Sequence, residues 1–270
     1  EKSMLVTGLN ITGRTVAQKS ALPAIEGILC NASHGLNLTG YNMETAITYH
    51  IDAEIHDAGD CILPAKLFGD IIRRLQAVAD QHGIAIVSSF ICWSQEPETR
   101  SQDNVRLVNR GFMIKPNAPI EIQDKRHLYA HGGEDKFFRP AQKRHIFEYK
   151  GVKILLLVCY DLRFPVWARN QSGNDYDIIL VVANWPDIRI QYWDALIAAR
   201  ATENQCYIAA VNCVGDDGMD LHYNGHSVAY DTRLQPIVSF ADDEEGTKIA
   251  EFDIDKLHHF REVLPLWKDI

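Results

Sequence analysis

Long apolar runs separated by polar turns divide most of the chain into strand-like segments. Runs such as GIAIVSSFIC, DIILVVANW and CYIAAVNCV are apolar at most positions, which is typical of strands covered on both faces. The pattern predicts strands at residues 83–92, 105–115, 152–160, 177–185, 206–214 and 247–254. The most apolar of these should be the central strands of a sheet.

Two other segments repeat their apolar residues at helical spacing. Residues 66–82 carry an apolar face, formed by Leu67, Ile71, Leu75, Val78 and Ala79. Gly83 follows as a natural helix end. Residues 188–204 predict a second helix with Trp193, Leu196 and Ile197 on one side. Strands and helices alternate without a repeat or linker, so we expect one layered domain over residues 1–270, with poor periodicity before residue 66.

The composition favours a protein that acts on small molecules. The chain has 270 residues, 46% of them hydrophobic, and a formal net charge of -9. A nucleic-acid or acidic membrane surface would need clustered Lys and Arg, which this balance argues against. There is no apolar run near the ~20 residues of a membrane span, and the first residues lack the order of a secretory signal. Six cysteines without metal-type spacing suit reduced thiols in the cytoplasm.

The segment KILLLVCYDLRFP places a thiol at the end of a very apolar strand. A buried cysteine is most often a small apolar filler, but ligands of α/β folds bind beyond the ends of such strands, where Cys159 lies. The backbone N–H of Tyr160 is well placed to meet an oxyanion. Asp161 and Arg163 are interpreted as a structural pair or as loop anchors, and not as part of the chemistry.

A thiol reacts as thiolate, so a cation and a base should lie near it. The stretch IEIQDKRHLYAHGGEDKFF, residues 120–138, offers Lys125 and, in a Gly-rich turn, Glu134. A solvated charged loop is the alternative interpretation of this run.

Taken in order, DKRHL, GGED, LLVCYDLRFPVWARN, ANWP and ARATENQCY resemble the nitrilase or carbon-nitrogen hydrolase superfamily, and within it the omega-amidase-like branch. The resemblance covers about three quarters of the chain, from near residue 66 to FREVLPLWKD. It implies a single-domain α/β fold, the four-layer αββα sandwich, and a homodimer. It also implies a Glu, Lys and Cys triad with no metal and no organic cofactor.

By motif, the resemblance makes Cys159 the nucleophile, Lys125 the triad lysine and Glu134 the additional acidic residue. Tyr160 would contribute its backbone N–H, while Asn184 and Trp185 would line the pocket, although Trp185 could equally cap the core. The general-base Glu is not at its expected place. The segment SHGLNLTGYNMETA aligns Gly35 there, and CILPAKLF offers Ala65; the other candidates are Glu26, Glu44 and Glu54.

Two functions therefore stand. The first is an amidase that hydrolyses the terminal amide of a small carboxylated substrate such as 2-oxoglutaramate, with Arg126, Arg139 or Arg189 receiving the carboxylate. The second is a catalytically impaired relative that binds a ligand or partner. A serine nucleophile in NGHSVAY and a zinc site at His127 and His131 fit worse, because neither has the required helix.

Overall fold

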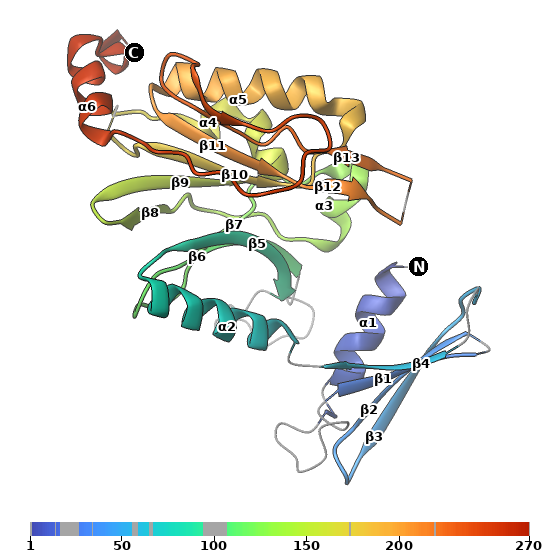
Figure 1. Cartoon of the computed structure of the whole chain (residues 1–270). Coiled ribbons are helices and arrows are strands. Elements are labelled where there is room, and N and C mark those ends of the chain that lie inside the picture. The colour runs from blue at the N-terminus through green and yellow to red at the C-terminus, as the bar shows by residue number, and fades with distance from the viewer. Residues whose placement is uncertain are drawn as a thin grey trace. The chain divides into compact units, whose positions relative to one another are not determined.

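The computed structural model describes residues 2–13, 15–16, 27–33, 35–55, 59–64, 67–93, 107–172, 174–218 and 220–269. These residues form two compact units, Glu1–Val78 and Ala79–Ile270 (Figure 1). We describe each unit by itself. The expectation of one domain across residues 1–270 stays a prediction.

The first unit is a helix on an antiparallel sheet. Helix α1 (Lys2–Gly13) packs on four strands, β1 (Gly27–Ala32), β2 (Leu36–Tyr41), β3 (Ala46–Ile51) and β4 (Gly59–Pro64), in the order β3-β2-β1-β4. Their alternating burial encloses a small core of Val16, Ile28, Cys30, Leu38 and Ile51. The short, polar strands explain why the sequence pattern predicted no element here.

Helix α2 (Leu67–His82) confirms the predicted helix over 66–82 and crosses the boundary between the two units. Gly83 ends it in the left-handed conformation with φ of 62°, which a glycine adopts without strain. In the last turn Ala79 is fully buried, and Asp80 accepts the N–H of Asn117 at 2.7 Å. The end of α2 is thereby joined to the turn that follows strand β6.

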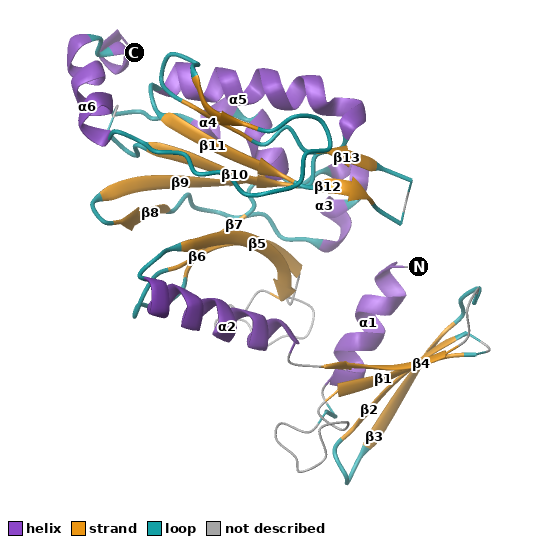
Figure 2. Ribbon diagram, in the orientation of Figure 1, coloured by secondary structure: helices purple, strands orange, loops and turns teal. Residues whose placement is uncertain are grey.

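The second unit contains two main sheets and, besides them, a two-stranded one formed by β12 (Val214–Asp216) and β13 (His222–Asn224) (Figure 2). The smaller is antiparallel in the order β5 (Ile86–Trp93), β6 (Leu107–Ile114) and β7 (Glu121–Asp124). The larger has the order β15 (Pro236–Ser239), β14 (Val228–Tyr230), β11 (Tyr207–Asn212), β10 (Ile178–Ala183), β9 (Val152–Val158) and β8 (Ile146–Tyr149). Its central strands β9, β10 and β11 are parallel and correspond to predicted strands.

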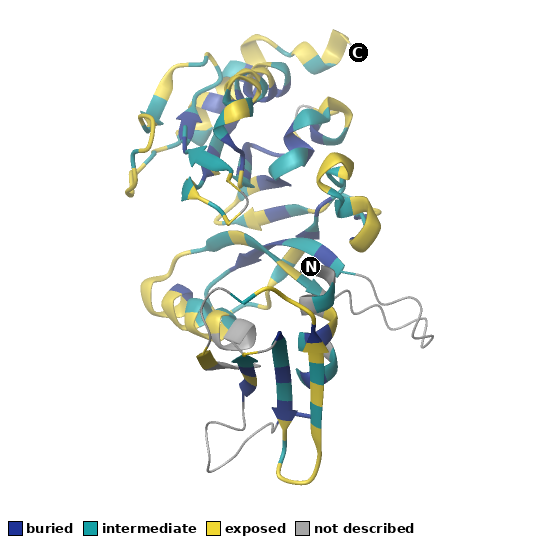
Figure 3. Ribbon diagram, turned by 90° about the vertical axis from the view of Figure 1, so that its right-hand side faces the viewer, coloured by how far each residue is buried: buried dark blue, intermediate teal, exposed yellow. Residues whose placement is uncertain are grey.

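Strand β9 is covered on both faces, as its sequence predicts. Ile154 and Leu156 belong to a core with Met113 of the smaller sheet, whereas Leu155 and Leu157 pack with residues of helix α5 (Ile190–Asn204). The buried positions therefore alternate between two cores along this strand. Buried residues of the second unit gather in its sheets, whereas its outer loops are largely exposed (Figure 3). The end of α2, the two sheets and α5 give the αββα layer order.

The predicted strand at 247–254 is wrong. Those residues form no strand, and helix α6 (Ile254–Val263) begins at the end of the segment. The Asp253 side chain accepts the N–H of Lys256 at 2.9 Å and caps the helix. The remaining short elements are α3 (Glu134–Phe137), α4 (Pro165–Ala168), β12 (Val214–Asp216), β13 (His222–Asn224), η3 (Ala130–Gly132), η4 (Cys159–Arg163), η5 (Asp187–Arg189) and η6 (Leu266–Asp269).

Candidate active site

Cys159 lies where strand β9 turns sharply into η4. Its φ is 48°, in the left-handed region that a residue with a Cβ rarely adopts. Such backbone strain persists only where the surroundings impose it, and it is common at functional sites. The Sγ atom donates to the Asn184 carbonyl oxygen at 3.8 Å, and Asn184 follows the neighbouring parallel strand β10. The thiol therefore lies at the carboxyl ends of two adjacent strands, as predicted.

Lys125 directly follows strand β7 and is almost completely buried, with 2% of its side chain exposed. Its ammonium donates to both carboxylate oxygens of Glu134, at 2.8 and 2.6 Å. Gly133, at φ of 76°, turns the chain just before Glu134, and the Tyr129 N–H donates to the same carboxylate at 2.7 Å. The run at 120–138 is thus an ordered loop built around a buried ion pair.

The charges of this pair act on the thiol in opposite directions. Burial raises the pKa of Cys159 above the ordinary thiol value, the Lys125 ammonium lowers it, and the carboxylates of Glu134 and Asp161 raise it. The net result is a raised pKa, so the thiol is neutral until a proton acceptor takes its hydrogen.

Asp161 joins the two segments that carry the thiol and the lysine. Its buried carboxylate accepts the N–H of Val158 at 3.4 Å, just before Cys159. It also accepts the N–H groups of Arg126 and His127 at 3.3 and 2.8 Å, just after Lys125, and lies 2.9 Å from the His127 ring nitrogen Nδ1. These hydrogen bonds fix the end of β9 against the end of β7.

Asp161 is therefore a loop anchor, one of the two interpretations drawn from the sequence, and it forms no pair with Arg163. The Arg163 guanidinium lies over the rings of Trp185 and Tyr192 at 5.0 Å each, and of Tyr160 at 5.8 Å. The pair fails because the backbone N–H groups around Asp161 already saturate its carboxylate. Among the described residues, no carboxylate forms an ion pair with Arg163. This aromatic-flanked cation was missed as a ligand-binding candidate.

Trp185 is mainly a core residue. Its side chain is 3% exposed, and its ring lies 5.6 Å from that of Trp193. Asn212 holds its backbone from both sides, since Asn212 Oδ1 accepts the Trp185 N–H at 2.7 Å and Asn212 Nδ2 donates to the Trp185 carbonyl at 2.8 Å. These two hydrogen bonds also fix the preceding residue, Asn184, whose carbonyl accepts the hydrogen bond of the thiol. Pocket-lining roles for Asn184 and Trp185 stay predictions.

The other candidate cations differ in the hydrogen bonds and ring contacts that they make. Arg126 donates to the Ala141 carbonyl at 2.6 Å and stacks over Trp167, so it serves the loop. Arg189 lies 5.5 Å over the ring of Tyr129, which in turn lies 5.0 Å from the Tyr160 ring. Arg139 is hydrogen-bonded through its backbone N–H to Leu107. Arg189 therefore belongs to the same aromatic cluster as Arg163.

The candidates for the general base lie in the first unit. Glu44 is exposed in the turn between β2 and β3, where its N–H donates to Asn42 Oδ1 at 3.1 Å, and Glu54 is exposed after β3. Gly35 precedes β2, while Glu26 and Ala65 lie outside the described residues. In the second unit, Glu134 and Asp161 are the carboxylates that act on the thiol.

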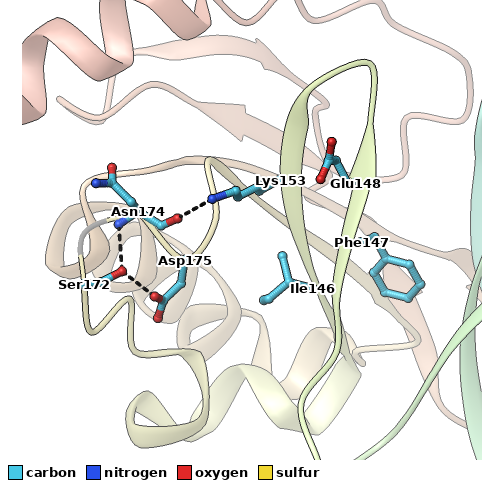
Figure 4. A pocket seen from close by; sticks show the side chains of 7 residues that line it. All are labelled: Ile146, Phe147, Glu148, Lys153, Ser172, Asn174 and Asp175. Carbon is cyan, nitrogen blue, oxygen red and sulfur yellow. Dashed lines mark hydrogen bonds between the residues drawn. The ribbon is translucent and has the colours of Figure 1, made fainter.

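A separate hollow lies at the edge of the larger sheet (Figure 4). It is lined by Ile146, Phe147, Glu148, Lys153, Ser172, Asn174 and Asp175, and shares no residue with the surroundings of Cys159. Lys153 Nζ donates across it to the Asn174 carbonyl at 3.1 Å. Ser172 and Asp175 are hydrogen-bonded to each other, and the hollow lies apart from the residues around Cys159, so it adds nothing to the chemistry of the thiol.

Comparison with known proteins identifies the family of the chain. Residues 36–262 match the carbon-nitrogen hydrolase family. The chain is 45% identical over 201 residues to the omega-amidase YafV of Escherichia coli K12, covering 74% of each. It is 32% identical over 197 residues to the 2-oxoglutaramate amidase of Bacillus subtilis, covering 73% of this chain and 72% of the relative.

A solved structure shows the same fold. The protein XC1258 of Xanthomonas campestris, described as a CN-hydrolase superfamily protein with an arsenic adduct in the active site, is 35% identical and has a TM-score of 0.64, covering 74% of each chain. The αββα fold predicted from the sequence is confirmed by this likeness.

Proposed function

The chain belongs to the carbon-nitrogen hydrolase family, and we propose that it hydrolyses the terminal amide of a small carboxylated substrate, such as 2-oxoglutaramate, to an acid and ammonia. The observation that carries this proposal is the strained Cys159 beside the buried Lys125–Glu134 ion pair. The relatives named as omega-amidase and 2-oxoglutaramate amidase support the substrate class.

In the proposed reaction Cys159 Sγ attacks the amide carbon and forms a tetrahedral intermediate. The Lys125 ammonium and the Tyr160 N–H stabilise the oxygen that becomes negative. The Lys125–Glu134 pair takes up the thiol proton and returns it to the departing nitrogen, so the C–N bond breaks and ammonia leaves a thioester. Water, activated by the same pair, then attacks the thioester and releases the acid and the thiol.

The carboxylate of the substrate requires a cation, and Arg163 fits that need best. It lies over Tyr160, the residue next to the nucleophile, and over Trp185, which follows Asn184. Rings on several sides exclude water from the guanidinium and strengthen its attraction for an anion. Arg189, above Tyr129, is the second candidate.

The impaired protein remains the second candidate function, because a specific observation favours it. The segment that aligns with the general-base motif contributes strand β2 to a hairpin of the first unit's antiparallel sheet, and Gly35 has no carboxylate to offer. Under this alternative the site binds a carboxylated amide without turning it over.

Ammonia release distinguishes the two functions. The intact protein and Cys159→Ala are each incubated with 2-oxoglutaramate, and ammonia and bound thioester are measured. Release that the variant abolishes supports the amidase. Saturable binding by the intact protein without release or thioester supports the impaired protein and overturns the first proposal.

We further infer that the protein acts as a homodimer in the cytoplasm, as the family resemblance implies. In the described part of the chain, no helix has the length and apolar character needed to cross a bilayer. Exposed apolar side chains on α4, η5 and α5 offer area for association: Val166, Ile188 and Tyr192. Sedimentation that gives the mass of one chain at micromolar concentration would overturn the dimer.

A further inference from the structure

The hydrogen-bond acceptor of the thiol lies just beyond the end of the parallel sheet. Strands β10 and β11 pair as far as Ala183 with Asn212. The next residue along the chain, Asn184, accepts the hydrogen of the Cys159 thiol through its carbonyl oxygen at 3.8 Å. The ladder between these strands therefore ends one residue before the carbonyl that contacts the nucleophile, and other groups must hold that carbonyl in place.

The side chain of Asn212 takes over where the ladder ends. It is buried, with 6% of the residue exposed, and its Oδ1 accepts the Trp185 N–H at 2.7 Å while its Nδ2 donates to the Trp185 carbonyl at 2.8 Å. The Trp185 N–H and the Asn184 carbonyl belong to one planar trans peptide, in which they point in opposite directions. By accepting this N–H, Asn212 fixes the direction of the carbonyl that meets the thiol.

Ser227 holds Asn212 in the same manner. The Ser227 hydroxyl accepts the Asn212 N–H at 3.0 Å and donates to the Asn212 carbonyl at 3.2 Å. Asn212 Nδ2 also donates to the Gly225 carbonyl at 2.8 Å, two residues before Ser227. The hydroxyl of this serine, which belongs to the segment NGHSVAY, is therefore occupied by backbone groups, and its place is explained without a serine nucleophile.

We propose that Asn212 and Ser227 are positioning residues of the nucleophile, because together they hold the Asn184 carbonyl in the direction of its thiol. This inference rests on the proposed function and deepens it. A carbonyl oxygen accepts a hydrogen bond without removing the proton, so it fixes the direction of the S–H bond and leaves the hydrogen for the proton acceptor of the reaction. A sulfur held in one orientation lies ready to attack, so the two residues should raise kcat and leave substrate binding unchanged.

The test observes the thiol directly and does not require turnover. Burial raises the pKa of Cys159, so the thiol keeps its hydrogen near neutral pH and has an S–H stretching band in the infrared. This band lies at lower frequency when the thiol donates a hydrogen bond, and subtraction of the spectrum of Cys159→Ala assigns it. The band is recorded for the intact protein, Asn212→Ala, Ser227→Ala and Ser227→Thr, which retains the hydroxyl.

Asn170 provides the matched control at the opposite end of β10. It is 4% exposed, its Nδ2 donates to the Tyr176 carbonyl at 3.1 Å, and its Oδ1 accepts the Asp175 N–H at 3.0 Å. Asn170→Ala therefore removes a similar buried bridge between side chain and backbone, but far along the strand from the thiol. The thermal transition of each variant verifies folding. If Asn212→Ala does not fold, Ser227→Ala, which removes only a hydroxyl, decides the question.

We expect the Cys159 band to move to higher frequency in Asn212→Ala and Ser227→Ala, and to keep its place in Ser227→Thr and Asn170→Ala. In the two shifted variants kcat for 2-oxoglutaramate should fall about tenfold with KM little changed. An unmoved band in both, or an equal shift in Asn170→Ala, would overturn the inference. A selective shift in a protein that releases no ammonia would support the positioning of the thiol and overturn the proposed function alone.

Discussion

Two segments of the chain resemble motifs of the same family, and they differ in how their residues are held. Residues 120–163 bring Lys125, Glu134 and Cys159 together through a buried ion pair and the hydrogen bonds of Asp161. The β2–β3 hairpin at residues 36–51 buries Leu38, but its Glu44 is exposed and interacts only with its own turn among the contacts described for it. Two segments that each resemble a family motif in sequence therefore lie in very different local environments.

This difference shows that a catalytic motif requires a suitable environment as well as the right residue types. A reacting group must be fixed by neighbours and partly removed from water, because its pKa and orientation depend on both. The segment around Cys159 meets that requirement through buried polar contacts between distant residues. In the β2–β3 hairpin, Glu44 and Thr45 are exposed, and Asn37 and Thr39 are only half-buried.

The largest effect should come from removing the charge of Lys125. Lys125→Met keeps the length of the side chain but leaves Glu134 without its cation and the oxyanion without its main donor. We expect a destabilisation of about 3 kcal/mol, the cost of breaking a buried pair, and a loss of kcat/KM of about 10²–10³. Urea unfolding and ammonia release measure the two effects.

The exposed pair of Lys248 with Glu244 provides the control. Lys248→Met should change the free energy of unfolding by less than about 0.5 kcal/mol, since exposed i, i+4 pairs contribute little. Equal effects of the two substitutions would contradict the special status of the Lys125 ion pair.

Exchanging carboxylates compares the two segments directly. Glu134→Gln should lower kcat about 100-fold because the pair can no longer take up the thiol proton. The same change removes a charge that raises the pKa of Cys159, so alkylation of the thiol by iodoacetamide near neutral pH should become faster. Rate measurements of both reactions on one preparation test these opposite signs.

Glu44→Gln is the matched exchange in the hairpin, and it should leave both rates unchanged. A large loss of ammonia release in Glu44→Gln, with Glu134→Gln nearly intact, would transfer the base to the first unit and overturn the assignment to the Lys125–Glu134 pair.

A smaller effect is expected from Asp161, which positions the thiol and does not react. Asp161→Asn retains the size of the side chain but replaces one acceptor oxygen with a donor that faces backbone N–H groups. We expect a destabilisation of about 1–3 kcal/mol and a fall in kcat of about tenfold with KM little changed. A change in KM alone would contradict a role in placing the thiol.

The sequence predicted the parts of this molecule that depend on local pattern. Apolar runs located β9, β10 and β11, and Gly83 marked the end of α2. The strand expected at 247–254 was wrong because alternation of charged and apolar residues does not specify a strand that has no partner, and the Asp253 cap starts a helix instead.

The pattern of apolar and polar residues did not predict the contacts between residues that are distant in sequence. Asp161 and Arg163 are near in sequence and opposite in charge, so a pair was the natural interpretation, yet the backbone of Arg126 and His127 takes the carboxylate. The position of Arg163 among three rings depends on tertiary packing that spacing does not encode. The roles of Lys125 and Glu134 came from the family resemblance, and their ion pair gives those roles a physical basis.

The smallest effect should arise in the loop at residues 213–227, which two half-buried histidines, His222 and His226, connect to acidic neighbours. Hydrogen bonds with Asp216 and Asp243 raise the pKa of His222. For His226, burial lowers the pKa, but hydrogen bonds with Asp242 and Asp194 outweigh it, so the net shift is upward. These ion pairs span β12, α5 and the segment after β15.

Because both histidines have raised pKa values in the folded state, they stabilise the loop fully below their unfolded value near 6.5 and lose that contribution as pH rises through the folded values. Hydrogen exchange of residues 213–227, corrected for the intrinsic rate, should therefore show less protection at about pH 9 than at about pH 6. His226→Asn should remove most of this dependence, because an amide does not titrate. If the pH dependence persists in both His226→Asn and His222→Asn, other groups control the loop. Whereas the Lys125 pair is held by burial, this loop would then be held by other groups that titrate.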